Sequence, residues 1–292
     1  MKVGIVLPQS PSEGGDTWRD VLALARQAEA GGIDSLWVCD HFLYRPPDGP
    51  ETGYHEPMTL LTALAASTER VELGSLVLAT SFRSPGLLAK MAATLDDVSG
   101  QRLTLGLGCG WHEPEYRSFG YPFDHRVGRF EEVLSIVVPL IRGERVTFRG
   151  TWSRVEDAVI LPVPTRLDLP ILVAADGDRM LRLTARFADA WQTAWYGHPD
   201  ERWPVRLRRF RAACEAEDRD PDSLDVTVGV DVNGPVESAP AGARHLPVDA
   251  AALADGLSAW SDQGVDHVQL GLEVCTPSAL DVVIDAVARL RA

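Results

Sequence analysis

The chain has 292 residues, 45% of them hydrophobic and 24% charged, a composition typical of a globular protein that buries a core of its own. Its formal net charge is −14 at pH 7, and Lys and Arg form no cluster, so nucleic acid and anionic membrane surfaces are not expected partners. No apolar run reaches the length of a membrane span. Residues 1–8 reach a proline too early for a signal peptide, so we expect a cytoplasmic protein.

The cysteines predict reduced thiols. There are four in a large chain, and none belongs to a C-x-x-C pair, so metal binding and a disulfide framework are both disfavoured. They are Cys39, Cys109, Cys214 and Cys275.

Eight short apolar runs alternate with segments of helical periodicity along the chain. Runs that are apolar on both faces and are separated by helices are typical of parallel strands. The runs that predict strands cover residues 3–7, 35–39, 71–79, 103–107, 171–174, 190–194, 226–232 and 267–272.

The helices in the first half of the chain have recognisable start and stop signals. The first is expected to begin at an N-cap at Asp16 and to end at Gly31. Pro57 predicts the start of the second helix, which should end near Thr68. Ser84 and Pro85 predict the start of the third, and Gly100 its end.

The second half of the chain contains an insertion in this alternation of strands and helices. Residues 144–169 contain two apolar runs, 145–148 and 158–161, on either side of a turn at Gly150, and we interpret them as an inserted two-stranded excursion. Pro139 is expected to kink the preceding helix near its end. The Gly- and Pro-rich segment 234–247 is expected to be a mobile loop.

These units predict one α/β domain over residues 1–292, a (β/α)₈ TIM-type barrel with an inserted β-excursion between its fourth and fifth strands. A doubly wound sheet is the main alternative. Its nucleotide loop would be the first turn, residues 8–15, which has no G-x-G-x-x-G pattern. The glycines at 106, 108 and 110 resemble that pattern only superficially.

In such a barrel the active site lies at the carboxyl ends of the strands. Asp40 and His41 follow the second strand, and aromatic side chains such as Trp111, Trp195 and Tyr196 follow the fourth and sixth. Aromatic residues beside titratable groups suit a flat conjugated ligand with proton chemistry next to it. Each aromatic residue could equally pack the barrel rim.

Several segments resemble the luciferase-like oxidoreductases. The resemblance rests on residues 32–41 (GIDSLWVCDH), 66–74 (ASTERVELG), 99–108 (SGQRLTLGLG) and 110–116 (GWHEPEY), and it continues through residues 126–132. These segments occur in order and are clearest up to about residue 200.

This resemblance implies the cofactor and the reaction. The cofactor would be coenzyme F420, or FMN as the alternative, and the Gly110-Trp111 pattern is more similar to the F420 branch. An F420 enzyme would transfer hydride between the cofactor and a small organic substrate. An FMN enzyme would be a monooxygenase that uses oxygen and flavin reduced by a separate reductase. The resemblance also implies a homodimer and a non-proline cis peptide at Leu76-Val77.

The resemblance assigns roles to the residues at the strand ends. His41 is the predicted catalytic residue, which donates a proton or stabilises negative charge, and Asp40 orients it or binds the cofactor. Glu115 could instead be a solvated loop carboxylate. The predicted cofactor-binding residues are Asp40, Leu76, Val77, Ala79, Cys109, Gly110, Trp111, Glu115, Ala174, Ala175, Asp176 and Gly177.

The loop after the fifth strand departs from the family pattern. It is Gly-rich in the family, where backbone N–H groups approach the cofactor phosphate, but here it contains Asp176 and Asp178. If Asp176 faces a phosphate, like-charge repulsion weakens binding, and Asp176→Gly would tighten it. The phosphate could instead use Gly177 and Arg179. A third hypothesis is therefore a barrel that has lost its cofactor site and does not catalyse a reaction.

A metal-dependent hydrolase is the remaining alternative. The chain has neither an H-x-H motif in its first strand nor an H-E-x-x-H helix. Asp40 and His41 are adjacent, so on a strand their side chains would point in opposite directions. No metal site is predicted.

Overall fold

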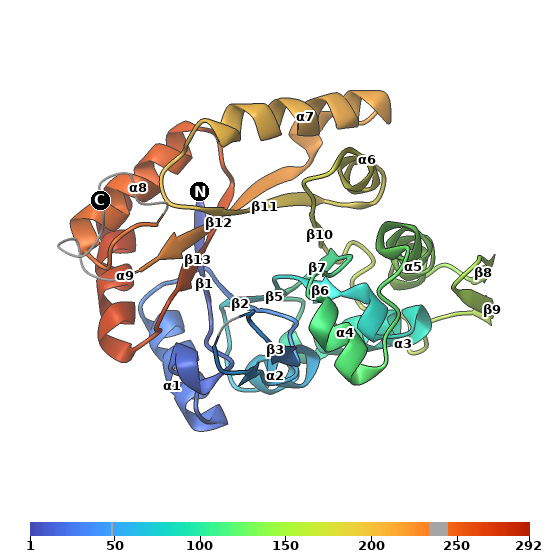
Figure 1. Cartoon of the computed structure of the whole chain (residues 1–292), viewed down its shortest axis with the longest axis horizontal. Coiled ribbons are helices and arrows are strands. Elements are labelled where there is room, and N and C mark those ends of the chain that lie inside the picture. The colour runs from blue at the N-terminus through green and yellow to red at the C-terminus, as the bar shows by residue number, and fades with distance from the viewer. Residues whose placement is uncertain (48, 234–244) are drawn as a thin grey trace.

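The computed structural model describes residues 1–47, 49–233 and 245–292. Eight parallel strands form a closed barrel with helices on its outside (Figure 1). Pairing of the last strand with the first, and of β7 with β10, completes the circle. The predicted TIM-type barrel is therefore confirmed. Its strands are β1 (Lys2–Val6), β2 (Ser35–Val38), β5 (Glu72–Ser75), β7 (Leu103–Gly108), β10 (Ile171–Ala174), β11 (Ala190–Tyr196), β12 (Asp225–Val232) and β13 (His267–Leu272).

The helices pack around the barrel and bury one apolar stripe each against it (Figure 1). Within the described part of the chain, none is long and apolar enough to cross a membrane. They are α1 (Trp18–Ala30), α2 (Pro57–Ala65), α3 (Pro85–Ser99), α4 (Glu113–Phe119), α5 (Arg126–Ile141), α6 (Asp178–Phe187), α7 (Arg202–Ala216), α8 (Ala250–Asp262) and α9 (Pro277–Leu290), with short 3₁₀ turns η1 (Pro11–Glu13), η2 (Thr80–Phe82) and η3 (Pro221–Ser223).

The ends of the helices correct the predicted boundaries by a few residues. The predicted N-cap of α1 was wrong: Thr17, and not Asp16, caps it through a capping box in which Asp20 returns the hydrogen bond. Helix α2 ends at Ala65, before the predicted position. Gly100 ends α3 in the left-handed conformation, as predicted.

The insertion between α5 and β10 is an antiparallel hairpin of β8 (Val146–Arg149) and β9 (Arg154–Ala158). Its first strand agrees with the prediction, but the second begins and ends earlier than the apolar run 158–161 suggested. Helix α5 continues through Pro139 to Ile141. A second small hairpin, β3 (Leu43–Tyr44) with β4 (Thr52–Gly53), follows β2. Most of the loop predicted at 234–247 lies outside the described residues.

The third barrel strand is interrupted where the sequence predicted one continuous strand over residues 71–79. Strand β5 ends at Ser75, the Leu76–Val77 peptide is cis, and the chain resumes as β6 (Leu78–Ala79), which pairs with β7. The predicted cis peptide is therefore confirmed. A second non-proline cis peptide, Ala194–Trp195, occurs in β11 and was not predicted.

Three buried polar side chains are hydrogen-bonded in a row inside the barrel, near the amino-terminal ends of β2 and β13. The Trp37 indole N–H donates to Ser35 Oγ at 2.7 Å, and Ser35 Oγ lies 2.7 Å from His267 Nε2. Ser35 Oγ thus links the Trp37 indole to the His267 imidazole inside the barrel. Burial, together with the nearby charge of Lys2, lowers the pKa of His267 to about 3.

We predict that His267 makes the protein sensitive to acid. In the unfolded chain His267 binds a proton with a pKa of about 6.5, whereas in the folded chain this pKa is about 3. The free energy of unfolding is therefore unaffected by His267 above pH 6.5 and decreases as the pH falls from 6.5 toward 3. The loss should be about 1.4 kcal/mol per pH unit within this range. Urea unfolding at pH 7 and pH 5 of the wild type and of His267→Gln measures it.

The variant should show a smaller loss of unfolding free energy between the two pH values. His125→Gln is the control, because His125 is exposed and should leave the pH dependence unchanged. An equal loss in wild type and His267→Gln would contradict the prediction.

Candidate functional site

A pocket of about 260 Å³ opens at the carboxyl ends of the barrel strands. It brings together His41 and every predicted cofactor-binding residue up to position 174. Three further residues that the sequence did not single out for the cofactor, Gly108, Gln192 and Ala194, complete it with Trp195. The full lining is Asp40, His41, Leu76, Val77, Ala79, Gly108, Cys109, Gly110, Trp111, Glu115, Ala174, Gln192, Ala194 and Trp195.

Glycines of β7 let the cis-peptide segment approach closely. A Cβ on Gly106 would lie 1.8 Å from the Ser75 carbonyl oxygen, and one on Gly108 would lie 2.7 Å from the Val77 side chain. No side chain can be placed at either position without displacing backbone or Val77. The segment therefore lies flat against β7 and forms one apolar wall of the pocket.

Asp40 holds this wall through a buried ion pair. Its Oδ2 accepts hydrogen bonds from the Ala79 backbone N–H at 2.8 Å and from Arg83 Nη1 at 2.6 Å, and its Oδ1 accepts from Arg83 Nη2 at 3.2 Å. Arg83 also donates to Glu56, the N-cap of α2. Burial raises the pKa of Asp40 and the Arg83 guanidinium opposes that rise. No sequence motif pointed to Arg83.

Glu115 positions His41. The carboxylate is 2% exposed; one oxygen lies 2.9 Å from His41 Nδ1 and the other accepts from the Phe42 backbone N–H at 3.0 Å. Because a carboxylate accepts hydrogen bonds, Nδ1 carries the proton, and Nε2 is left without a hydrogen-bond partner among the described residues. The alternative of a solvated Glu115 is wrong.

His112 supports the same corner of the pocket. It is buried, and its Nε2 accepts from the Arg45 backbone N–H at 3.0 Å. Burial lowers the pKa of His112, which agrees with a neutral ring that accepts this bond. The rings of His112 and Trp111 lie 6.3 Å and 5.6 Å from the His41 ring. No sequence motif pointed to the bond between His112 and the loop after β2.

The acidic loop after β10 lies outside this pocket. Asp176 is exposed, and its carboxylate pairs with Arg206 at 3.1 Å and Arg209 at 3.8 Å, both on α7. Ala175 is buried, and its carbonyl accepts from the Trp191 indole. Gly177 is the N-cap of α6 and provides no side-chain cap, so N–H groups of the first turn have no side-chain partner there.

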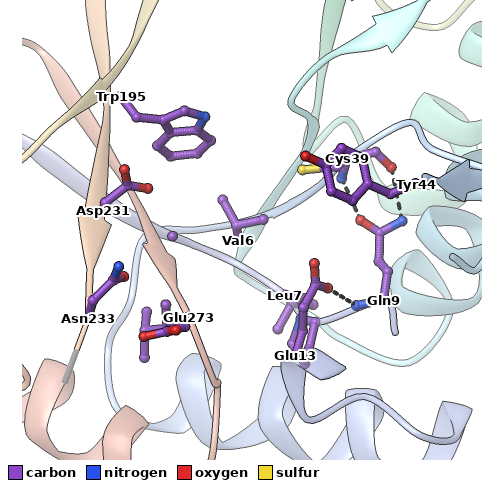
Figure 2. Close-up of a pocket in the computed structure, with 13 residues that line it drawn as sticks. Val6, Leu7, Gln9, Glu13, Cys39, Tyr44, Trp195, Asp231, Asn233 and Glu273 are labelled. Carbon is purple, nitrogen blue, oxygen red and sulfur yellow. Dashed lines mark hydrogen bonds between the residues drawn. The ribbon is translucent and has the colours of Figure 1, made fainter. Parts of the chain in front are cut away.

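A second and larger pocket, of about 640 Å³, adjoins the first at the barrel mouth (Figure 2). Trp195 lines both pockets. The ring of Tyr44, in the larger pocket, lies 6.4 Å from that of His41 in the smaller one. The lining is Val6, Leu7, Pro8, Gln9, Glu13, Cys39, Tyr44, Trp195, Asp231, Asn233, Gly271, Leu272 and Glu273.

Neither pocket contains the ligands of a metal centre. Over residues 1–47, 49–233 and 245–292, no three His, Cys, Asp or Glu side chains converge on a point where they could hold a metal ion. The four cysteines are free thiols, as predicted.

Comparison with known proteins identifies the family. The family model described as luciferase-like monooxygenase matches residues 1–246. The chain belongs to the luciferase-like monooxygenase family, in agreement with the resemblance found in its sequence.

Individual relatives add detail. An F420-dependent glucose-6-phosphate dehydrogenase of Beutenbergia cavernae is 40% identical over 179 residues, which cover 59% of this chain and 52% of that enzyme. The corresponding enzyme of Nakamurella multipartita is 34% identical over 215 residues, 72% of this chain and 62% of that enzyme. The match thus spans between half and two thirds of these enzymes. Among solved structures, an F420-dependent secondary alcohol dehydrogenase has a TM-score of 0.82 at 17% identity, with 100% of this chain and 99% of that chain covered, and shows the same fold.

We predict that Asp40→Ala destabilises the protein by about 3–5 kcal/mol, because it leaves the buried Arg83 guanidinium without its carboxylate. The free energy of unfolding from urea denaturation measures the effect. The matched control is Glu113→Ala, which breaks the exposed pair with Arg117 and should cost less than about 1 kcal/mol. Equal costs in the two variants would refute this account of Asp40.

Proposed function

We propose that the chain is an F420-dependent oxidoreductase that transfers hydride between the deazaflavin and a small organic substrate, with residues 1–292 acting as one catalytic domain. The observation that carries the proposal is the joint placement of His41, the cis peptide and the β7 end around one pocket. The F420-dependent relatives, up to 40% identical, support the choice of cofactor.

The residues around the smaller pocket fit a flat ring. Leu76 and Val77 form an apolar wall, and Gly108 and Gly110 lie beside it, where Val77 and the Tyr116 hydroxyl occupy the positions that a Cβ would take. The uncapped first turn of α6 at Gly177 offers N–H groups to a phosphate, and no atom lies within 4 Å of the position a Cβ would take there. When bound, F420 would supply the acceptor or donor of a hydride.

His41 would handle the proton of the reaction. Its Nε2 has no hydrogen-bond partner among the described residues. Because Nδ1 carries the proton that it donates to Glu115, Nε2 is the proton acceptor of the neutral imidazole. If the substrate is an alcohol, its oxidation releases one proton from the hydroxyl, which Nε2 can accept as a general base. We assign Asp40 a positioning role, since both of its oxygens are bonded to Arg83 and one also to the Ala79 N–H.

Parallel equilibrium titrations of the purified protein with oxidised F420 and with FMN test the proposal, with cofactor fluorescence as the readout. Tight F420 binding and weak FMN binding would support it. The reverse result, with oxygen consumption in the presence of reduced flavin and a separate reductase, would identify an FMN monooxygenase. Binding of neither would leave a non-catalytic barrel.

The role of His41 has its own test. With the most active alcohol of a substrate panel, His41→Ala should lower kcat by about 10²–10⁴-fold, the usual contribution of a positioned general base, and leave the dissociation constant of F420 nearly unchanged. His198→Ala is the control, because His198 is exposed and lies outside both pockets. An unaltered kcat in His41→Ala would remove the histidine from the mechanism.

The structure leaves the expected effect of Asp176→Gly on cofactor affinity in the same direction as the sequence predicted. Asp176→Gly should tighten F420 binding, but by less than about tenfold, because Arg206 and Arg209 already neutralise part of the carboxylate charge. Asp178→Asn serves as a comparison, since Asp178 carries an equal charge and pairs with Arg209 on the same helix. An unchanged dissociation constant in Asp176→Gly would show that this carboxylate does not act on the cofactor phosphate.

A further inference from the structure

The larger pocket at the barrel mouth is lined by carboxylates from three separate elements. Asp231 lies on β12, Glu273 directly follows β13, and Glu13 ends η1. Figure 2 shows Asp231 and Glu273 on one side of the pocket and Glu13, bonded to the Gln9 N–H, on the other. No Lys or Arg is among the described residues that line it. The described part of its wall therefore carries three carboxylates and no Lys or Arg side chain.

Asp231 stands beside an aromatic ring that faces the same space. A Cβ built on Gly271 would lie 3.2 Å from the Trp195 ring and 3.8 Å from Asp231 Oδ1, so the indole and the carboxylate flank one glycine. Trp195 is 38% exposed. The Asp231 backbone carbonyl accepts from the Leu246 N–H at 2.8 Å, whereas its carboxylate has no hydrogen bond among the described residues and His245 is the described cationic group that acts on it. A carboxylate next to an open aromatic face is the arrangement that recognises an organic cation.

The arrangement does not suit a metal ion. The carboxylates face the pocket from different sides, and within the described ranges no three of them converge on a metal-binding point. The volume, about 640 Å³, is that of a pocket for a small organic molecule, and Tyr44 adds a second aromatic wall. Trp195 connects it to the pocket that holds His41.

We propose that the larger pocket is the substrate site and that it binds an amine-bearing organic molecule, whose cationic group lies between Asp231 and the Trp195 ring. The proposal rests on the proposed function, since it names the substrate class of that site. An anionic substrate such as a phosphorylated sugar would meet three carboxylates and no described cationic side chain, so it is disfavoured.

Calorimetric titration of the cofactor-free protein with three probes of similar size tests the proposal. The probes are 2-phenylethylamine, the neutral 2-phenylethanol and the anionic 3-phenylpropionate, with glucose 6-phosphate as a fourth. We expect the amine to bind about tenfold or more tightly than each of the others. Asp231→Asn should weaken amine binding by about tenfold and leave the alcohol unaffected.

Asp262→Asn is the matched control, because it removes the same charge from an exposed position on α8. It should leave amine affinity at the wild-type value, and circular dichroism should show both variants folded. The proposal is overturned if 3-phenylpropionate or glucose 6-phosphate binds as tightly as the amine, or if Asp231→Asn binds the amine as the wild type does. Failure of the proposed function appears separately, as absent F420 binding in the cofactor titration.

Discussion

The hydrogen bonds between β7 and β10 close the sheet into a barrel, and the site depends on that closure. Because the eight strands are parallel, their carboxyl ends meet at one rim. Residues at or just after the ends of four different strands, at positions 40, 76, 109 and 174, therefore line a single pocket. An open sheet would leave the ends of its outer strands far apart, and these side chains could not surround one ligand.

At the rim, buried charges are bonded within the protein. Asp40 is bonded to Arg83 and Glu115 to His41, and each carboxylate also accepts a backbone N–H from the loop or strand that it holds. Buried ion pairs of this kind are weak contributors to net stability, because the cost of desolvation offsets much of the attraction. Their effect here is geometric, since they hold the cis-peptide wall and the His41 ring in place and leave Nε2 of His41 without a hydrogen-bond partner among the described residues.

Charge is distributed differently over the two parts of the mouth. In the loop after β10, guanidinium groups of α7 face Asp176 and reduce its field. In the larger pocket, no Lys or Arg of the described lining faces Asp231; burial raises the pKa of Asp231, and nearby His245 opposes that rise. The described charges thus favour an anion less in the larger pocket than in the loop after β10.

The sequence by itself determined the alternation of strands and helices and several helix ends, such as the end of α3 at Gly100, because periodicity and capping act over a few neighbouring residues. It also placed His41 and the strand-end residues up to position 174, because the barrel fixes where its strands end. Only the tertiary structure decided the partners of these residues. Arg83 meets Asp40 across 43 positions, and Asp231 meets Trp195 across the rim. Such contacts depend on barrel closure and side-chain direction, which no local pattern encodes.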